Sequence, residues 1–141
     1  MQCYDVAQKL GVNNYESYLI SAEILIKKGE YKKSIEVCNN AVRINPYDPR
    51  AYYFLGTNFF HIRDLNSSIE NFKKTIDIKP DYADAYNGIA LCYSKALHPK
   101  EAQENFNKAL EINPDFFIAR INSADAFYAA GDIVSALAQF Q

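Results

Sequence analysis

The residue types that most often do chemistry in proteins are few and scattered in this sequence. Two histidines, His61 and His98, and three cysteines, Cys3, Cys38 and Cys92, are spread along 141 residues. No Cys-x-x-Cys pair occurs, and the spacing indicates neither a zinc site nor a disulfide framework. We therefore predict no metal site and no cofactor. A chain without a disulfide framework favours a reducing compartment, here taken as the cytoplasm.

Sequence motifs of common enzymes are also missing. The chain has no Gly-x-x-x-x-Gly-Lys-Ser/Thr loop, no Gly-x-Gly-x-x-Gly and no His-Glu-x-x-His. We interpret His61 and His98 as surface or capping histidines and Cys38 as a buried thiol. The prediction is a chain that is not an enzyme.

Charge and composition exclude two further classes. Lys and Arg number 15 against 17 Asp and Glu, the net charge is −2, and the signs are interspersed. Binding to nucleic acid or to an anionic membrane surface needs clusters of Lys and Arg, which the chain lacks. No signal peptide opens the sequence, and no run approaches the roughly 18 apolar residues of a membrane span.

The informative feature is an internal repeat. Segments AVRINPYDPRAY, TIDIKPDYADAY and ALEINPDFFIAR resemble one another. Their prolines, Pro46, Pro80 and Pro114, are evenly spaced, with a period of about 34 residues. Further positions recur with the same period, including these sets: Ile44, Ile78 and Ile112; Tyr18, Tyr52 and Tyr86; Leu25, Phe59, Tyr93 and Phe127. Such a period indicates stacked structural repeats.

Each repeat divides into two helical stretches. Apolar residues recur at helical spacing in both, as in Tyr52, Leu55 and Phe59. The turns between stretches fall at Gly29-Glu30, Arg63-Asp64, His98-Pro99 and Gly131-Asp132. Each proline of the period closes a helix, and Asp48, Asp81 and Asp115 are expected to cap the next one.

This pattern resembles the tetratricopeptide repeat. Small residues stand at its eighth place (Ala22, Gly56, Ala90, Ala124) and its twentieth place (Ser34, Ser68, Ala102, Ala136). The resemblance implies an all-α fold, a right-handed α-solenoid of antiparallel helix hairpins. Three residues depart from the pattern: Arg120 replaces a bulky aromatic residue, and Arg63 and Leu97 replace glycine.

Repeat boundaries follow from the period. We predict full repeats at 15–48, 49–82 and 83–116 and a truncated fourth repeat at 117–141. The segment 1–14 is predicted to be helical, because Tyr4, Ala7 and Leu10 match the end of a preceding second helix. A parent array longer on both sides is the expectation, and a first helix that starts at a native Met1 as a cap is the alternative.

The resemblance also places the binding surface. In this family the first helices line a concave groove, and geometry around each helix selects the residues that face it. The predicted peptide-binding groove consists of Tyr53, Phe60, Asn87, Leu91, Ile121, Asn122, Asp125 and Tyr128. Its apolar side chains and two amides suit a partner peptide or amphipathic helix.

Several functions remain open at this point. The leading one is a scaffold or adaptor that binds a protein partner in the groove. The alternatives are self-assembly through apolar solenoid ends, giving a homo-oligomer, and the targeting arm of a larger enzyme. We expect no clamp for the C-terminal carboxylate of chaperone tails, because the corresponding places lack the basic residues that a carboxylate needs.

Overall fold

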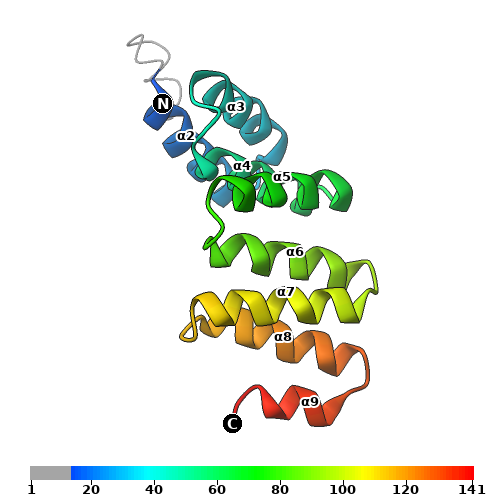
Figure 1. Cartoon of the computed structure of the whole chain (residues 1–141). Helices are drawn as coiled ribbons and strands as arrows, with labels where there is room; N and C mark the ends of the chain where they lie inside the picture. The colour runs from blue at the N-terminus through cyan, green and yellow to red at the C-terminus, as the bar shows by residue number, and fades with distance from the viewer. Residues whose placement is uncertain (1–13) are drawn as a thin grey trace. The chain divides into compact units, whose positions relative to one another are not determined.

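The computed structural model describes residues 14–141, which contain eight helices and no strand (Figure 1). The predicted helical segment at 1–14 lies outside the described residues apart from Asn14. The helices are α2 (Tyr15–Lys27), α3 (Tyr31–Ile44), α4 (Pro49–His61), α5 (Leu65–Ile78), α6 (Ala83–Lys95), α7 (Pro99–Ile112), α8 (Phe117–Ala129) and α9 (Ile133–Ala138). The all-helical class predicted from the sequence is therefore confirmed. Across the described part of the chain, no helix is both long and apolar enough to cross a membrane.

The chain folds as two compact units, one that ends at Ile78 and one that spans Lys79–Gln141. Each unit contains two antiparallel hairpins, α2–α3 and α4–α5 in the first and α6–α7 and α8–α9 in the second. Within a unit, the second helix of one hairpin packs on the first helix of the next, α3 on α4 and α7 on α8. The same stacking rule therefore operates inside both units.

The helix that follows each closing proline starts in one of two ways. The Asp48 side chain accepts a hydrogen bond from the Arg50 backbone N–H at 2.9 Å, and Pro49 follows as the first helical residue, as predicted. Asp81 and Asp115 were predicted as caps too, and this was wrong. Tyr82 and Phe116 occupy the N-cap positions and make no side-chain cap bond. The two aspartates stand one residue earlier in their repeats than Asp48 does.

All four turns between the helices of a hairpin contain one residue with positive φ at the same place in the repeat. These residues are Gly29, Arg63, Leu97 and Gly131, with φ from 61° to 82°. The backbone N–H of the residue that follows bonds back across the helix end, for example His98 to the carbonyl of Tyr93 at 2.9 Å. This is a left-handed helix C-cap, a conformation that costs a residue with a Cβ more than it costs glycine.

Hairpins close tightly where small residues face each other. The Ser34 hydroxyl donates to the Ala22 carbonyl at 3.2 Å, and the Ser68 hydroxyl donates to the Gly56 carbonyl at 2.7 Å. Both serines are fully buried. A helix backbone can be approached this closely only where its own side chain is small, which explains the small residues at the eighth and twentieth places.

Aliphatic and aromatic residues of the period fill the space around these contacts. Leu25, Val37, Cys38 and Leu55 form a buried cluster in the first unit, on which Phe59 packs. Phe106 holds the place of Cys38 in the second unit, where it packs with Ala90 and Ala102. The recurring set that includes Leu25, Phe59 and Tyr93 thus belongs to or packs on the core of each unit. The recurring isoleucines differ, because Ile44, Ile78 and Ile112 at the helix ends are 50%, 36% and 38% exposed.

Gly56→Ala tests how tightly α4 and α5 are packed. A Cβ on Gly56 would lie 2.7 Å from the Phe72 ring, closer than van der Waals contact allows. We expect a net loss of about 1–2 kcal/mol in urea unfolding, because overpacking outweighs the better helix propensity of alanine. In a double-mutant cycle, Phe72→Leu should relieve part of that loss. Purely additive losses would show that the ring is not the obstacle.

Leu97→Gly should stabilise the second unit. Leu97 holds a φ of 61° and is 86% exposed, so glycine relieves strain and removes little packing. The expected gain is up to about 1 kcal/mol, the left-handed penalty less the entropy cost of glycine. Ala96→Gly is the matched control, because Ala96 has an ordinary φ of −82° and should lose stability. If the thermal unfolding midpoint falls for both variants, Leu97 is not strained by its positive φ.

Candidate functional site

The predicted groove residues all lie on first helices, and they are divided between the two units. Tyr53 and Phe60 are on α4 of the first unit. The other six are on α6 and α8 of the second unit: Asn87, Leu91, Ile121, Asn122, Asp125 and Tyr128. We call these six the α6–α8 face. Each unit is considered by itself below.

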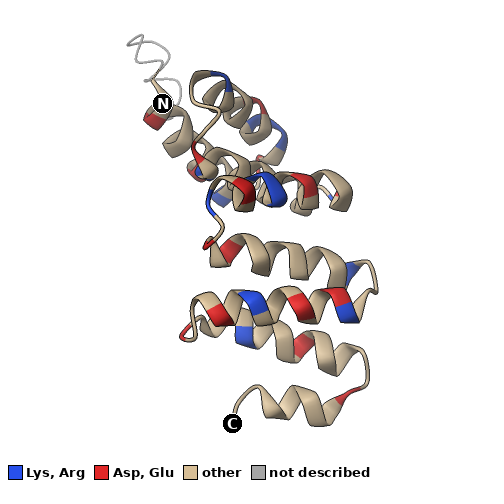
Figure 2. Ribbon diagram, viewed as in Figure 1, with Lys and Arg blue, Asp and Glu red and all other residues tan. Residues whose placement is uncertain are grey.

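Exposed apolar side chains are concentrated on α8. Ile121 is 49% exposed and Tyr128 is 70% exposed, and with Asp125 they lie on one side of the helix at spacings of four and three. Leu91 of α6 is half-buried and packs against the Phe106 cluster. Figure 2 shows few charges on α8 and α9; Arg120, Asp125 and Asp132 are the charged residues of 117–141. The face is therefore apolar with one carboxylate.

Two amides join α6 to α8. The side-chain N–H of Asn122 donates to the Asn87 amide oxygen at 3.1 Å, and Asn87 is almost fully buried. An amide side chain has two N–H donors and two acceptor lone pairs, so one shared bond leaves both residues with further capacity. The bond fixes the orientation of both amide groups, and Asn122 directly follows Ile121 in the sequence.

Tyr53 and Phe60 are more engaged than the sequence suggested. The Tyr53 ring lies 5.7 Å from the Phe72 ring and 6.0 Å from the Phe54 ring, measured between centroids. Phe60 meets His61 edge to face at 5.7 Å. Both side chains are half-buried. Leu19, one repeat before Tyr53 and at the same place, is in the core at 4% exposure, packed with Ala41 and Ala51.

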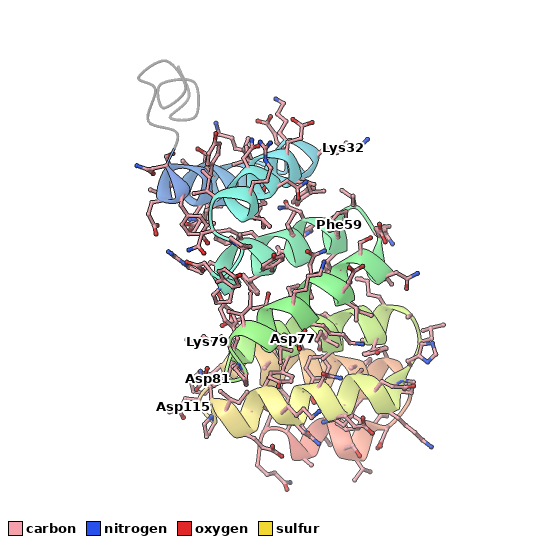
Figure 3. The ribbon with its side chains drawn as sticks, turned by 45° about the horizontal axis from the view of Figure 1, so that its top comes forward. Lys32, Phe59, Asp77, Lys79, Asp81 and Asp115 are labelled. Carbon is pink, nitrogen blue, oxygen red and sulfur yellow. The ribbon has the colours of Figure 1, made fainter. Side chains whose placement is uncertain are left out.

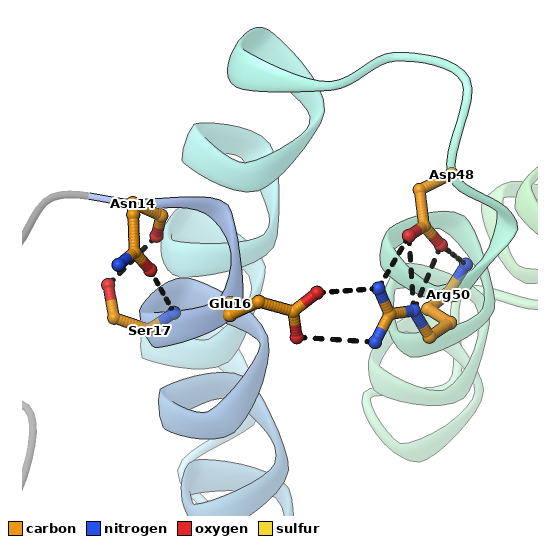
Figure 4. Close-up of polar contacts among 5 residues, drawn as sticks. All are labelled: Asn14, Glu16, Ser17, Asp48 and Arg50. Carbon is orange, nitrogen blue, oxygen red and sulfur yellow. Dashed lines mark hydrogen bonds and ion pairs between the residues drawn. The ribbon is translucent and has the colours of Figure 1, made fainter.

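An ion-pair network that sequence reasoning missed links the two hairpins of the first unit (Figure 4). The Arg50 guanidinium donates to Glu16 at 2.8 and 3.3 Å and to Asp48 at 2.7 and 3.1 Å. The central carbon of the Arg50 guanidinium also lies 5.6 Å from the centre of the Tyr15 ring. Glu16 and Arg50 occupy the same place in successive repeats, so opposite charges one period apart were the signal that could have revealed the pair.

The network shifts the pKa values of Asp48 and Tyr15. Burial alone would raise the pKa of Asp48, but hydrogen bonds from the Arg50 side chain and backbone hold it below its ordinary value. Burial of the Tyr15 phenol, together with the nearby Asp48 carboxylate, raises the Tyr15 pKa. Both groups therefore keep their ordinary charge at neutral pH.

Cys38 and the two histidines, the remaining residues with reactive side chains, have structural contacts. Cys38 is fully buried, as predicted, and burial raises its thiol pKa to about 12. His61 stacks on Tyr31 with ring centroids 4.5 Å apart, and burial lowers its pKa. His98 stands at the N-cap of α7, 3.6 Å from Glu101. Residues 14–141 include no group of three His, Cys, Asp or Glu side chains placed to hold a metal ion.

Comparison with known proteins points to one family. Family models described as "Tetratricopeptide repeat" match residues 15–48, 49–82 and 83–116. Human Tetratricopeptide repeat protein 16 is 28% identical over 133 residues, which cover 85% of this chain and 15% of that protein. Human Tetratricopeptide repeat protein 13 is 30% identical over 76 residues, 54% of this chain and 8% of that protein. The chain thus spans less than a fifth of the length of these two relatives.

Solved structures share the fold. A crystal structure of MamA is 27% identical, with a TM-score of 0.82 over 97% of this chain and 80% of that one. TTC0263, a tetratricopeptide protein of Thermus thermophilus, has a TM-score of 0.86 at 20% identity, over 97% of this chain and 76% of that one. YrrB, described as having an unusual peptide-binding site, has a TM-score of 0.73 at 18% identity, over 96% of this chain and 70% of that one. The latter two likenesses concern the fold alone.

Arg50→Met tests the ion-pair network, because it removes the charge and keeps an apolar stem. The Asp48 pKa is lowered in the folded state, so its stabilisation is present above the ordinary aspartate pKa of about 3.9 and is lost as the pH falls through the lowered value. We expect a loss of about 1 kcal/mol at neutral pH and a smaller loss in acid, measured by urea unfolding.

Glu16→Gln is the control for this variant. It should lower the free energy of unfolding by less than Arg50→Met does, because Glu16 is more exposed than Asp48. An equal loss for Arg50→Met at both pH values would assign the effect to packing on the Tyr15 ring instead of to charge.

Proposed function

Since the chain belongs to the tetratricopeptide repeat family, we propose that it is a non-catalytic interaction module that holds a segment of a partner protein. The α6–α8 face of the second unit is the proposed binding surface. The observation that carries the proposal is the exposure of Ile121 and Tyr128 on α8, the helix that the Asn87–Asn122 amide bond ties to α6. The buried thiols of Cys38 and Cys92 suit a reducing compartment such as the cytoplasm.

The chemistry of the face specifies the ligand. Apolar side chains in water favour a ligand that covers them with its own apolar side chains. Amides with spare donor and acceptor capacity favour a backbone whose N–H and C=O groups are still open, which is the case for an extended peptide. The Asp125 carboxylate favours a Lys or Arg nearby in that peptide. The proposed ligand is an extended segment with apolar residues and one basic residue.

The same face is poorly suited to a chain terminus. A C-terminal carboxylate needs Lys or Arg donors, and the six residues of the α6–α8 face include none. Arg120 of α8 instead donates to the Pro114 carbonyl at 2.7 Å. We therefore propose an internal segment as the ligand.

Selection from a random-sequence peptide library, followed by affinity measurement, tests this function. Peptides enriched on the wild-type chain should contain apolar residues and a Lys or Arg. Ile121→Glu should weaken their binding about tenfold or more, because a charge replaces an apolar contact at the centre of the face. Asn122→Ala should also weaken binding, by removing an amide contact.

Val134→Glu is the matched control, because Val134 is 80% exposed on α9 and lies outside the face. Its affinity should equal that of the wild-type chain, and its unfolding midpoint confirms that an added glutamate is tolerated. Equal affinity for Ile121→Glu and Val134→Glu would place the peptide elsewhere. No enriched peptide at all would end the proposal of a peptide-binding face.

A further inference from the structure

The turn of the α6–α7 hairpin and the end of α8 border a small pocket in the second unit. Its volume is about 290 Å³, and its lining residues are Ser94, Leu97, Pro99, Ala126, Ala129 and Ala130. Five of these side chains are apolar, and the sixth has a hydroxyl group. We call this the turn pocket. Sites for whole small molecules have volumes of roughly 300–1,000 Å³, so the turn pocket suits a single side chain of a ligand.

The turn pocket continues the α6–α8 face. Ser94 follows Leu91 on α6 by three residues, and Ala129 follows Asp125 on α8 by four residues. These spacings put each pair on one side of its helix. A peptide held on the α6–α8 face can therefore place one of its side chains in the turn pocket.

The first unit shows which kind of group occupies the corresponding place. Two repeats before Pro99 and Ala129, the same places have Tyr31 and His61. The two rings stack, with centroids 4.5 Å apart and 5° between their planes. In the second unit both rings are replaced by smaller side chains, and both replacements line the turn pocket. A place that holds stacked rings in the first unit is thus open in the second.

The pocket of the first unit differs in position and in chemistry. Its lining residues are Gly29, Glu30, Tyr31, Lys32, Lys33 and Ile62. His61 is not among them, and the Lys32 side chain projects into solvent (Figure 3). The apolar lining therefore distinguishes the turn pocket from its counterpart in the first unit.

Leu97 is a second, independent observation. It has a strained φ of 61° and is 86% exposed, so its side chain adds little to the packing of the chain. Gly29 stands at the same place in the first unit. A strained residue that packing does not require points to a use of its side chain in function, and Leu97 lines the turn pocket.

We propose that the turn pocket binds an aromatic side chain of the partner peptide, against Leu97 and Ala129. An aromatic ring offers a large apolar area and loses little conformational freedom when it is bound. The Ser94 hydroxyl adds a donor and acceptor for the phenol of a tyrosine. This proposal rests on the proposed function, because the α6–α8 face must hold the rest of the peptide.

Titration with p-cresol, the side chain of tyrosine as a free molecule, tests the turn pocket without a peptide. In NMR spectra of the whole chain, the methyl signals of Leu97, Ala126, Ala129 and Ala130 should shift and saturate at millimolar concentrations, as expected for a ligand of so few atoms. Ala129→His should abolish these shifts, because its imidazole fills the pocket as His61 does in the first unit. Unshifted signals in the wild-type chain, or equal shifts in a folded Ala129→His variant, would overturn the proposal.

Leu97→Gly separates ring binding from stability. We expect its affinity for p-cresol to fall about threefold, because dispersion contacts with the ring are lost, while its unfolding midpoint rises. Ala96→Gly is the matched control, since Ala96 is not a lining residue. Its midpoint should fall and its affinity should equal that of the wild-type chain. An affinity that falls in both variants or in neither would contradict the role of Leu97.

Peptides selected on the wild-type chain link the turn pocket to the proposed function. They should contain an aromatic residue, and its replacement by alanine should weaken binding to the wild-type chain about tenfold. The same replacement should have little effect on binding to Ala129→His, in which the pocket is already filled.

The two proposals fail in different ways. Selected peptides that bind equally well without the ring overturn the aromatic site, whereas a loss of their binding in Ile121→Glu still supports the α6–α8 face. If no peptide is enriched although p-cresol shifts the pocket methyls, the proposed function fails, and with it the peptide as the source of the ring.

Discussion

The close approach of two helices at a pair of small residues is the contact on which the rest of the structure depends. Each buried serine of the second helix reaches a backbone carbonyl of the first, Ser34 to Ala22 and Ser68 to Gly56. A larger side chain in place of Ala22 or Gly56 would separate the helices and leave the serine hydroxyl without its acceptor in a dry interior, at a cost of about 1–3 kcal/mol. This contact explains part of the repeat in the sequence, because small residues recur at these two places once in every hairpin.

Tight hairpins decide what is left for function. A helix that gives one side to its own partner and another to the preceding hairpin has a third side that remains exposed, and in α8 that side is apolar. In the first unit the corresponding residues are used differently: Arg50 joins Glu16 and Asp48, and the Tyr53 ring lies against Phe72. The two units therefore share a fold and differ in the chemistry of the surface they present. Binding chemistry belongs to particular side chains and not to the fold.

The turn residues show how firmly the period controls the backbone. Arg63 and Leu97 adopt positive φ at places where Gly29 and Gly131 do so without strain. The local preference of arginine and leucine is overruled by the hydrogen bonds that end the first helix and by the packing of both helices on each other. A strained turn of this kind is retained because the contacts on either side of it determine the conformation.

The sequence by itself determined the helices, their pairing and the core, because a given place in the repeat has a similar environment each time it recurs. The closing prolines and the Asp48 cap could be read directly, since their effects are local. The tertiary structure alone decided which first-helix residues are exposed. Leu19 is buried where Ile121 is exposed, although helical geometry gives both the same side, because exposure depends on what the neighbouring helix brings. Likewise the link from Arg50 to Glu16 required two helices to be placed side by side.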